Sequence, residues 1–417
     1  MREMTHVAAM ETWGIGAAAI AAIMCRPWRI GEWVWPVVAS AALVACGLIS
    51  GSDAAAAALD GLDVYLFLAG MLTLAEIARV HGVFDWLAAK MADRAAGNAL
   101  RLFVWVYGSG IAVTALLSND GTIVLLTPAV LALTKRVRLP GEPYLYACAF
   151  ISNAASFVLP ISNPANLVVF RQLPKLLPWL WAFAVPSAVA IAVTFAVLRY
   201  VFRRDLQLGY QTAAAPIRLD GQGLRAFVVV SASAAAIVAA AGFGLPIGRV
   251  TIICAAISLL SMSLVKTSTF GTVVREAPWS IIPLVAGLFV IVQALDRTGV
   301  LADARLFFRH AGSMPHAPAR VLVGGAVALA DNVLNNLPVG ILTRYALRDN
   351  AIAPHVANAA LVGVDLGPNL SLTGSLATLL WLMMLRREGI EVSPWRFIGV
   401  GAFVTVPALV VALVCVR

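Results

Sequence analysis

The sequence predicts an all-α polytopic membrane protein with ten transmembrane helices and two re-entrant helical hairpins. Hydrophobic residues make up 61% of the 417 residues and charged residues only 12%, with a mean hydropathy of +0.89. Soluble domains carry about 25% charged residues. Apolar segments long enough to cross a bilayer, about 20 residues each, recur along the whole chain, and sequence features repeat between its two halves. These observations exclude an ordinary soluble protein.

The net charge of +9 does not indicate a nucleic-acid partner here, because basic residues gather in the cytoplasmic loops of membrane proteins. Two further apolar stretches, 102–134 and 321–343, contain polar residues at their centres, as hairpins that enter and leave on one side do. The ten predicted spanning helices are 7–25, 33–50, 62–78, 143–170, 178–199, 224–242, 248–265, 278–296, 355–384 and 396–416.

Basic residues flank the stretch 102–134 on both sides, which places both flanks in the cytoplasm and makes this stretch re-entrant. They are Arg79, Lys90, Arg94, Arg101, Lys135, Arg136 and Arg138. With this topology the linker between the halves is cytoplasmic and both termini lie outside. We expect a multi-pass protein of the cell inner (plasma) membrane.

An internal repeat relates the two halves of the chain. Asn336 follows Asn119 by 217 residues, and beyond the hairpins Pro354 follows Pro143 by 211 residues. We therefore predict a first repeat at 1–205 with a cytoplasm-facing hairpin 102–134, a cytoplasmic linker at 206–223, and a second repeat at 224–417 with an outward-facing hairpin 321–343. An odd number of crossings in each half inverts the second repeat, and inverted repeats with interrupted helices are typical of secondary transporters.

Four polar interruptions within apolar sequence are predicted to converge on one substrate site. Freed backbone groups are tolerated at membrane depth only when they are buried in protein or line a cavity, and helix starts carry partial positive charge. The alternative interpretation is polar contact between helices. The candidate substrate-binding residues are Ser118, Asn119, Thr122, Ser162, Asn163, Asn166, Asn335, Asn336, Thr373, Gly374, Ser375 and Thr378.

Acidic residues in these segments are the candidates for proton coupling. A carboxylate at the bilayer centre costs about 2.5–3.5 kcal/mol, and burial without a basic partner favours its protonated form. Asp120 and Asp365 are therefore predicted to carry the coupling proton. The alternative is that each only accepts backbone N–H bonds, and we interpret Asp331 as structural.

The sequence predicts neither a metal site nor an organic cofactor. The histidines fall in loops or at helix ends, and no Walker-type phosphate loop or paired catalytic residues occur, so an enzyme is not expected. The cysteines show no CxxC or Cys/His spacing; they are Cys25, Cys46, Cys148, Cys254 and Cys415.

Four motifs give the chain a resemblance to the arsenite efflux permeases (ArsB type) of the ion transporter superfamily. They are LSNDGTIVLLTP from Leu117, LPISNPANLVVF from Leu159, DNVLNNLP from Asp331 and DLGPNLSLTGSLATLLWL from Asp365. The resemblance implies a scaffold and a mobile transport domain, usually in a homodimer, that work by an elevator-like movement. It also implies export of arsenite or antimonite, As(III) or Sb(III), in exchange for protons. Some members associate with a cytosolic ATPase subunit.

Two departures from related sequences bear on the substrate. Carboxylate symporters of this superfamily carry Ser-Asn-Thr at both tips, whereas this chain has Asp120 at the first and Leu337 at the second. An aspartate repels a dianion, so dicarboxylate transport is disfavoured. Asn369 stands where some arsenite permeases carry a basic residue. A cation/proton antiporter, another small-solute transporter (silicic acid, anion) and a passive channel remain alternatives.

Overall fold

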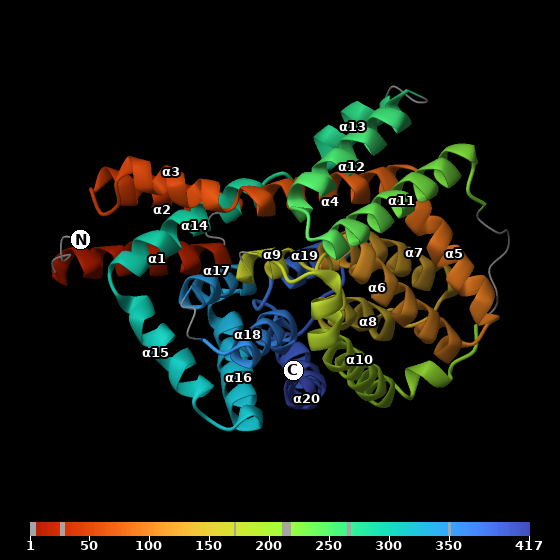
Figure 1. Cartoon of the computed structure of the whole chain (residues 1–417). Helices are drawn as coiled ribbons and strands as arrows, with labels where there is room; N and C mark the ends of the chain where they lie inside the picture. The colour runs from red at the N-terminus through yellow and green to blue at the C-terminus, as the bar shows by residue number, and fades with distance from the viewer. Residues whose placement is uncertain (1–5, 26–29, 171, 211–217, 265–267, 349–351) are drawn as a thin grey trace.

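A computed structural model describes the chain except for residues 1–5, 26–29, 171, 211–217, 265–267 and 349–351 (Figure 1). The described part of the chain is helical and contains no β-strand, only an isolated bridge between Asn98 and Gly209. Part of the predicted linker 206–223 lies outside the described residues. The part of the linker before this gap contacts the segment that precedes the first hairpin, where the Ala99 N–H donates to the Leu208 carbonyl oxygen at 3.2 Å.

The helices fall into two series that follow each other along the chain. The first half contains α1 (His6–Cys25), α2 (Val34–Ala45), α3 (Gly51–Asp60), α4 (Leu62–Val80), α5 (Val83–Ala95), α6 (Ala99–Gly121), α7 (Thr127–Val137), α8 (Glu142–Ala154), α9 (Pro164–Val169) and α10 (Leu176–Val201). The second half contains α11 (Gly221–Phe243), α12 (Ile247–Ser263), α13 (Ser268–Glu276), α14 (Ile281–Arg297), α15 (Val300–Gly312), α16 (His316–Leu334), α17 (Asn336–Ala346), α18 (Pro354–Leu366), α19 (Leu376–Arg387) and α20 (Pro394–Cys415).

The two series repeat the same helix boundaries. The starts of α3 and α13, of α5 and α15, and of α6 and α16 are each 217 residues apart. Gly82 and Gly299 precede α5 and α15 with φ of 69° and 85°, a conformation that glycine adopts at no steric cost. Beyond the hairpins, α8 and α18 start 212 residues apart, one more than the predicted spacing of 211. The opposite orientation of the halves in the membrane stays a prediction.

The predicted number of ten spanning helices is not confirmed. Among the described residues, seven helices are long and apolar enough to span a membrane, or eight if the bent pair α3 and α4 counts as one span. The predicted helices 143–170 and 355–384 are each interrupted, as α8 with α9 and as α18 with α19. At the second break Pro368 follows the end of α18 and has no backbone N–H with which to continue it. At the first break Pro164 opens α9, the position where a helix needs no backbone N–H.

The helices pack in two groups, which we name the exchanged group (α1–α4 and α11–α14) and the broken-helix group (α6–α10 and α16–α20). In the exchanged group α4 packs on α12 and α14 on α2, so that each pair joins the two halves of the chain. Small residues allow this approach: a Cβ on Gly70 would lie 2.8 Å from the Thr251 backbone, and close backbone contact is the usual basis of helix packing in membranes.

The broken-helix group pairs α6 with α8, α16 with α18, and α10 with α20. Its core includes a buried aromatic cluster in which Tyr146 and Phe397 lie 5.7 Å apart, with Trp381 5.8 Å from Tyr146. In Figure 1 the exchanged group lies along the top and the broken-helix group below it, with α5 and α15 at opposite sides. The groups meet where α4 contacts α6 and α9 and where α14 contacts α17.

Candidate functional site

The two predicted hairpins break at equivalent residues with the same backbone geometry. Ser118 has φ of 71° and ψ of 164°, and Asn335 has φ of 74° and ψ of 150°. Almost only glycine adopts this combination of φ and ψ in proteins. The chain reverses direction at the first break, as the distance of 3.5 Å between the Thr122 hydroxyl and the Gly110 carbonyl oxygen shows. Twelve residues of straight helix would separate these groups by about 18 Å.

Each hairpin tip is tied to the broken helix beside it by one backbone hydrogen bond. The Asn119 N–H donates to the Ser162 carbonyl oxygen and the Asn336 N–H to that of Gly374, both at 2.9 Å. In each case the acceptor directly precedes a helix-capping residue. Asn163 caps α9 by accepting from the Ala165 N–H, and Ser375 caps α19 by accepting from Thr378. The two tips therefore meet the two broken helices in the same way.

A small cavity lies where these four chain breaks converge. It measures about 20 Å³, room for about one water molecule. The structure thus brings together five of the predicted site residues, while the other predicted residues are not among those that line this cavity. The lining residues are Leu68, Asn119, Asp120, Asn163, Pro164, Ile281, Asn336, Leu337, Ser375 and Ala377.

Helix starts and one carboxyl group set the electrostatics of this cavity. Three helical segments begin at the wall of this cavity: the second arm of the first hairpin (residues 119–137), α17 and α19. Helix starts carry about half a positive elementary charge. The side chain of Asp120 supplies the opposite sign when ionised. No Lys or Arg is among the described residues that line the cavity, so Asp120 is the one formally charged side chain among them.

Asp365, the second predicted proton carrier, lies behind the cavity and is fully buried. Its Oδ1 accepts a hydrogen bond of 2.6 Å from Nδ2 of Asn163, which itself lines the cavity. Asp331 is also fully buried, and neither of its carboxyl oxygens has a hydrogen-bond partner among the described residues. The roles of Asp120 and Asp365 in proton coupling stay predictions.

In the first half, three of the predicted site residues hold the shape of the breaks. The Thr122 hydroxyl pairs with that of Thr114 at 2.7 Å inside the hairpin. Ser162 Oγ accepts from the Leu159 N–H at 3.0 Å. Nδ2 of Asn166 donates to the Ser156 carbonyl oxygen at 3.0 Å and faces two more carbonyls of the loop between α8 and α9. Ser118, at the tip, lines a second cavity of about 20 Å³ together with Asp120.

The predicted residues of the second half bond mainly to one another. Asn335 Nδ2 donates to the Thr373 carbonyl oxygen at 3.2 Å, and the hydroxyls of Ser375 and Thr378 lie 2.9 Å apart. Gly374 packs so closely that a Cβ would lie 2.6 Å from Pro368 Cα. Direct contact of these residues with substrate stays a prediction.

Three asparagines that the sequence analysis did not assign to the site support it from behind. Asn153 Nδ2 donates to Asn369 Oδ1 at 2.9 Å, and Asn369 Nδ2 donates to the Phe150 carbonyl oxygen at 3.0 Å, which joins the two broken helices. Asn332 Nδ2 donates to the Gly367 carbonyl oxygen at 3.0 Å. The position of Asn332 inside the DNVLNNLP motif is the signal that would have identified it.

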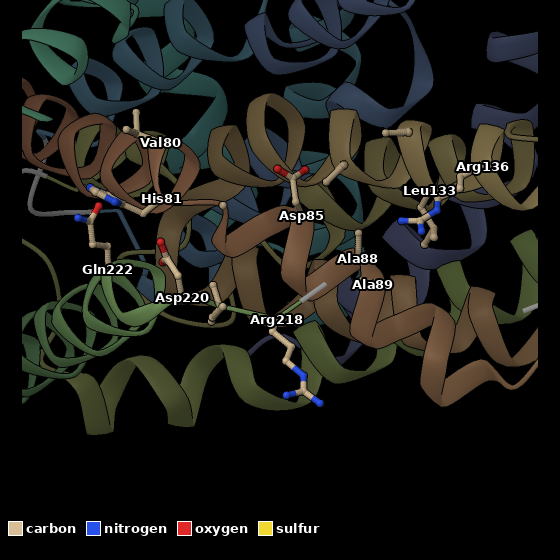
Figure 2. Close-up of a pocket in the computed structure, with 14 residues that line it drawn as sticks. Val80, His81, Asp85, Ala88, Ala89, Leu133, Arg136, Arg218, Asp220 and Gln222 are labelled. Atoms are coloured by element: carbon tan, nitrogen blue, oxygen red, sulfur yellow. The ribbon is translucent and has the colours of Figure 1, made fainter. Parts of the chain in front are cut away.

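A larger cavity of about 530 Å³ lies beside the first hairpin, between α5, α7 and the start of α11. Figure 2 shows Asp85, Arg136 and Asp220 around it, with Arg218 extending away. The helix α4 lines both this cavity, through Val80, and the small cavity at Ser118 and Asp120. The same two elements, α4 and the second arm of the hairpin, therefore run from the larger cavity to the candidate site.

Comparisons with known proteins agree with this architecture. The profile of the CitMHS family, described as "Citrate transporter", matches residues 9–364. The chain is 28% identical over 363 residues to the arsenical pump membrane protein of Escherichia coli strain K12, a match covering 80% of each chain. It is 27% identical over 351 residues to the arsenical pump membrane protein of Yersinia enterocolitica, again over 80% of each. These relatives confirm the resemblance carried by the four motifs.

Two further similarities concern transporters. The chain is 26% identical over 401 residues to an uncharacterized transporter of Mycobacterium tuberculosis, covering 93% of both. The solved YdaH transporter of Alcanivorax borkumensis has a similar fold, with a TM-score of 0.52 at 14% identity over 84% of this chain and 83% of that chain. Since the family profile spans most of the sequence and the helices include membrane spans, this chain belongs to the CitMHS family of the ion transporter superfamily, and it is a multi-pass membrane transporter rather than an enzyme.

Proposed function

We propose that this transporter exports arsenite or antimonite from the cytoplasm in exchange for protons. The single observation that supports this best is the cavity at four converging chain breaks, whose polar lining consists of amide, hydroxyl and carboxyl groups and whose wall includes helix starts. Arsenite near neutral pH is an uncharged trihydroxy species that donates and accepts hydrogen bonds. Asn119, Asn163 and Asn336 offer both kinds of partner to it.

Citrate fits this cavity poorly, although the family bears its name. A tricarboxylate near neutral pH needs several positive groups, and the described lining contains none from Lys or Arg. Asp120 would repel it at close range. A neutral solute needs no positive groups in the cavity and is not repelled by Asp120, because it carries no net charge. Silicic acid is also uncharged near neutral pH, so inhibition of arsenite transport by silicic acid can be measured to compare the two solutes.

Oxygen and nitrogen groups, not thiols, are proposed to hold the metalloid. The described cysteines are free, and each belongs to a different part of the fold: Cys46 follows α2, Cys148 lies on α8, Cys254 on α12 and Cys415 on α20. None of the four lines the small cavity. Weak hydrogen bonds also suit a carrier that must release its solute on the other side.

We propose an elevator-like mechanism in which the broken-helix group moves as the transport domain and the exchanged group is the scaffold of a homodimer. The separate packing of the two groups supports it, as does the closed candidate site at their contact. The larger cavity beside the first hairpin supports an approach from the cytoplasmic side, where the basic flanks of that hairpin place it. A cytosolic ATPase subunit would dock on this side in the cell inner membrane.

Everted membrane vesicles provide the test. Energised vesicles that contain the transporter are expected to accumulate arsenite, and an uncoupler is expected to abolish the accumulation. Asn336→Ala serves as the site-impaired control. Arsenite accumulation that is unchanged by the uncoupler would contradict proton exchange and favour a passive channel. Proton movement driven by Na⁺ or K⁺, with no effect of arsenite, would instead support a cation/proton antiporter.

A further inference from the structure

We propose that a second large cavity, at the opposite end of α4 from the cavity beside the first hairpin, is the vestibule through which the solute leaves on the external side. We further assign the ion pair of Arg344 with Asp60 as the gate of this vestibule. The inference rests on the proposed export function and deepens it, because it identifies the release path and the contact that controls it. We name this second space the outer cavity.

The outer cavity measures about 720 Å³. It lies between the end of α3, the start of α4, the end of α9 with the loop that follows it, the end of α11, the start of α12, and α17. Its charged lining residues are Asp60, Asp63, Lys175, Arg249 and Arg344. Its size and its charges of both signs suit a wet space in which an uncharged solute is released rather than held.

Two helices place the outer cavity about one membrane thickness away from the cavity beside the first hairpin. On α4, Asp63 lines the outer cavity and Val80 lines the other; on α11, Ala241 and Gln222 do the same. These pairs are 17 and 19 residues apart, or about 26 and 29 Å along a helix axis. The hydrocarbon core of a bilayer is about 30 Å thick. Since the basic flanks of the first hairpin predict that its cavity is cytoplasmic, the outer cavity opens on the external side.

The candidate site lies between the two large cavities and is closer to the outer one. On α4, Leu68 lines the small cavity of the candidate site; it is two residues from Leu66 in the outer cavity and twelve from Val80. On α9, Pro164 lines the small cavity and Leu167 the outer cavity, three residues or about 5 Å apart. About one helical turn of α9 therefore separates the candidate site from the outer cavity.

Arg344 lies where α17 and α9 bound the outer cavity. It follows Leu337, which lines the small cavity, by seven residues of α17, about 10 Å along the helix axis. Its guanidinium group donates to the carbonyl oxygens of Leu167 and Val168 at 3.4 and 3.5 Å. These carbonyls end α9, and helix ends carry partial negative charge that favours a cation. Arg344 therefore ties together the two elements that separate the candidate site from the outer cavity.

The same guanidinium group also reaches the exchanged group. It lies 3.1 Å from a carboxylate oxygen of Asp60, donates to the Asp60 carbonyl oxygen at 3.2 Å, and lies 5.4 Å from the ring centre of Phe289 on α14. The helices α9 and α17 belong to the broken-helix group, whereas α3 and α14 belong to the exchanged group. Movement of the broken-helix group keeps the contacts of Arg344 with α9 and separates it from Asp60. The ion pair is therefore the contact that opens when the candidate site reaches the outer cavity.

A thiol label in the outer cavity tests the release path. Gln172 is exposed and lines this cavity. In a transporter without the native cysteines, Gln172→Cys is labelled in spheroplasts with a bulky impermeant maleimide, and arsenite accumulation is then measured in everted vesicles. Accumulation should fall to a small fraction of the unlabelled value. Ser313→Cys is the matched control, because position 313 is exposed and predicted to lie outside but is not among the described residues that line the outer cavity. It should be labelled without loss of accumulation.

A cysteine in the candidate site reports the opening of the gate. Ala377→Cys lies in the wall of the small cavity, and its reaction with an impermeant thiol reagent from outside should be slow. Asp60→Asn keeps the size of the side chain but removes its charge, and it should speed this reaction several-fold. Arg348→Gln is the matched control and should leave the rate unchanged, because Arg348 also pairs with Asp60 at 3.1 Å but is not among the described lining of the outer cavity. If Asp60→Asn fails to fold, Arg344→Lys serves instead, since a lysine cannot bond to Asp60 and to the α9 carbonyls at once; it should speed the reaction as well.

The outcomes separate the inference from the proposed function. Full accumulation after external labelling of Gln172→Cys would overturn the vestibule. A reaction rate of Ala377→Cys that neither Asp60→Asn nor Arg344→Lys changes would overturn the gate. A parent transporter that accumulates no arsenite would instead overturn the proposed function. The reaction rates require no transport, so they test the inference in that case too, and faster reaction from the cytoplasmic side in Asp60→Asn would contradict it.

Discussion

The guanidinium group of Arg344 on α17 lies 3.1 Å from the carboxylate of Asp60 at the end of α3. The same side chain approaches the carbonyl oxygens of Leu167 and Val168, at 3.4 and 3.5 Å, near the end of α9. One residue of the second hairpin therefore bonds to the exchanged group and to a broken helix of the first half. If the broken-helix group moves relative to the exchanged group, either this ion pair breaks or Asp60 moves together with Arg344.

Replacement of Arg344 by Met should destabilise the folded transporter far more than replacement of Arg348. Arg344 is 5% exposed and Arg348 is 35% exposed, and both pair with Asp60. Removing one partner of a buried pair costs about 3 kcal/mol, whereas an exposed pair contributes up to about 1 kcal/mol. Thermal unfolding of the two variants in detergent measures the difference. Equal melting temperatures would contradict a structural role for the Arg344–Asp60 pair.

Glycine at the first hairpin tip should stabilise the transporter. Ser118 occupies a backbone conformation with φ of 71° that costs a residue with a side chain about 1–3 kcal/mol. Ser118→Gly is expected to raise the free energy of unfolding by about 1 kcal/mol, and Ser118→Val to lower it. At Asn335 the gain should be smaller, because its side chain also bonds to Thr373. A lower free energy of unfolding for Ser118→Gly would show that the Ser118 hydroxyl stabilises the fold by more than its backbone conformation costs.

Two asparagines predicted to bind substrate should separate into a structural and a functional residue. Asn166→Ala removes the amide donor that faces the Ser156 and Pro160 carbonyl oxygens, so the free energy of unfolding should fall by about 1–3 kcal/mol. Asn336→Ala keeps the backbone bond to Gly374 and should lose arsenite transport at nearly unchanged stability. Vesicle uptake and thermal unfolding on the same preparations check both. Full transport by Asn336→Ala would remove this residue from the proposed site.

Accessibility of single cysteines should place the two hairpins on opposite sides. Asp93→Cys and Pro140→Cys, both at exposed positions that flank the first hairpin, are expected to react with an impermeant thiol reagent from the cytoplasmic side. Ser313→Cys, before α16, should react from the outside. A background without the native cysteines provides the control. Labelling of the first two positions from different sides would end the inverted-repeat interpretation.

Local features of the sequence predicted the positions of the chain breaks better than the pairing of the helices. Polar residues inside apolar stretches marked the breaks at Ser118 and Asn335, since hydrocarbon does not tolerate free backbone groups. The short helices α3 and α13 were not predicted, because ten and nine residues with polar ends resemble loops. The ion pair of Asp60 with Arg344 was missed because its partners are far apart in sequence, and only tertiary packing brings them together.

The pairing of α4 with α12 and of α2 with α14 has a consequence for how the protein is made. When the ribosome has completed α4, the helix that will cover it has not been synthesised. Gly70 and its neighbours then face lipid or a chaperone until α12 is inserted and can pack against them. The first half therefore enters the membrane unfinished, and its assembly waits for the second half of the same polypeptide.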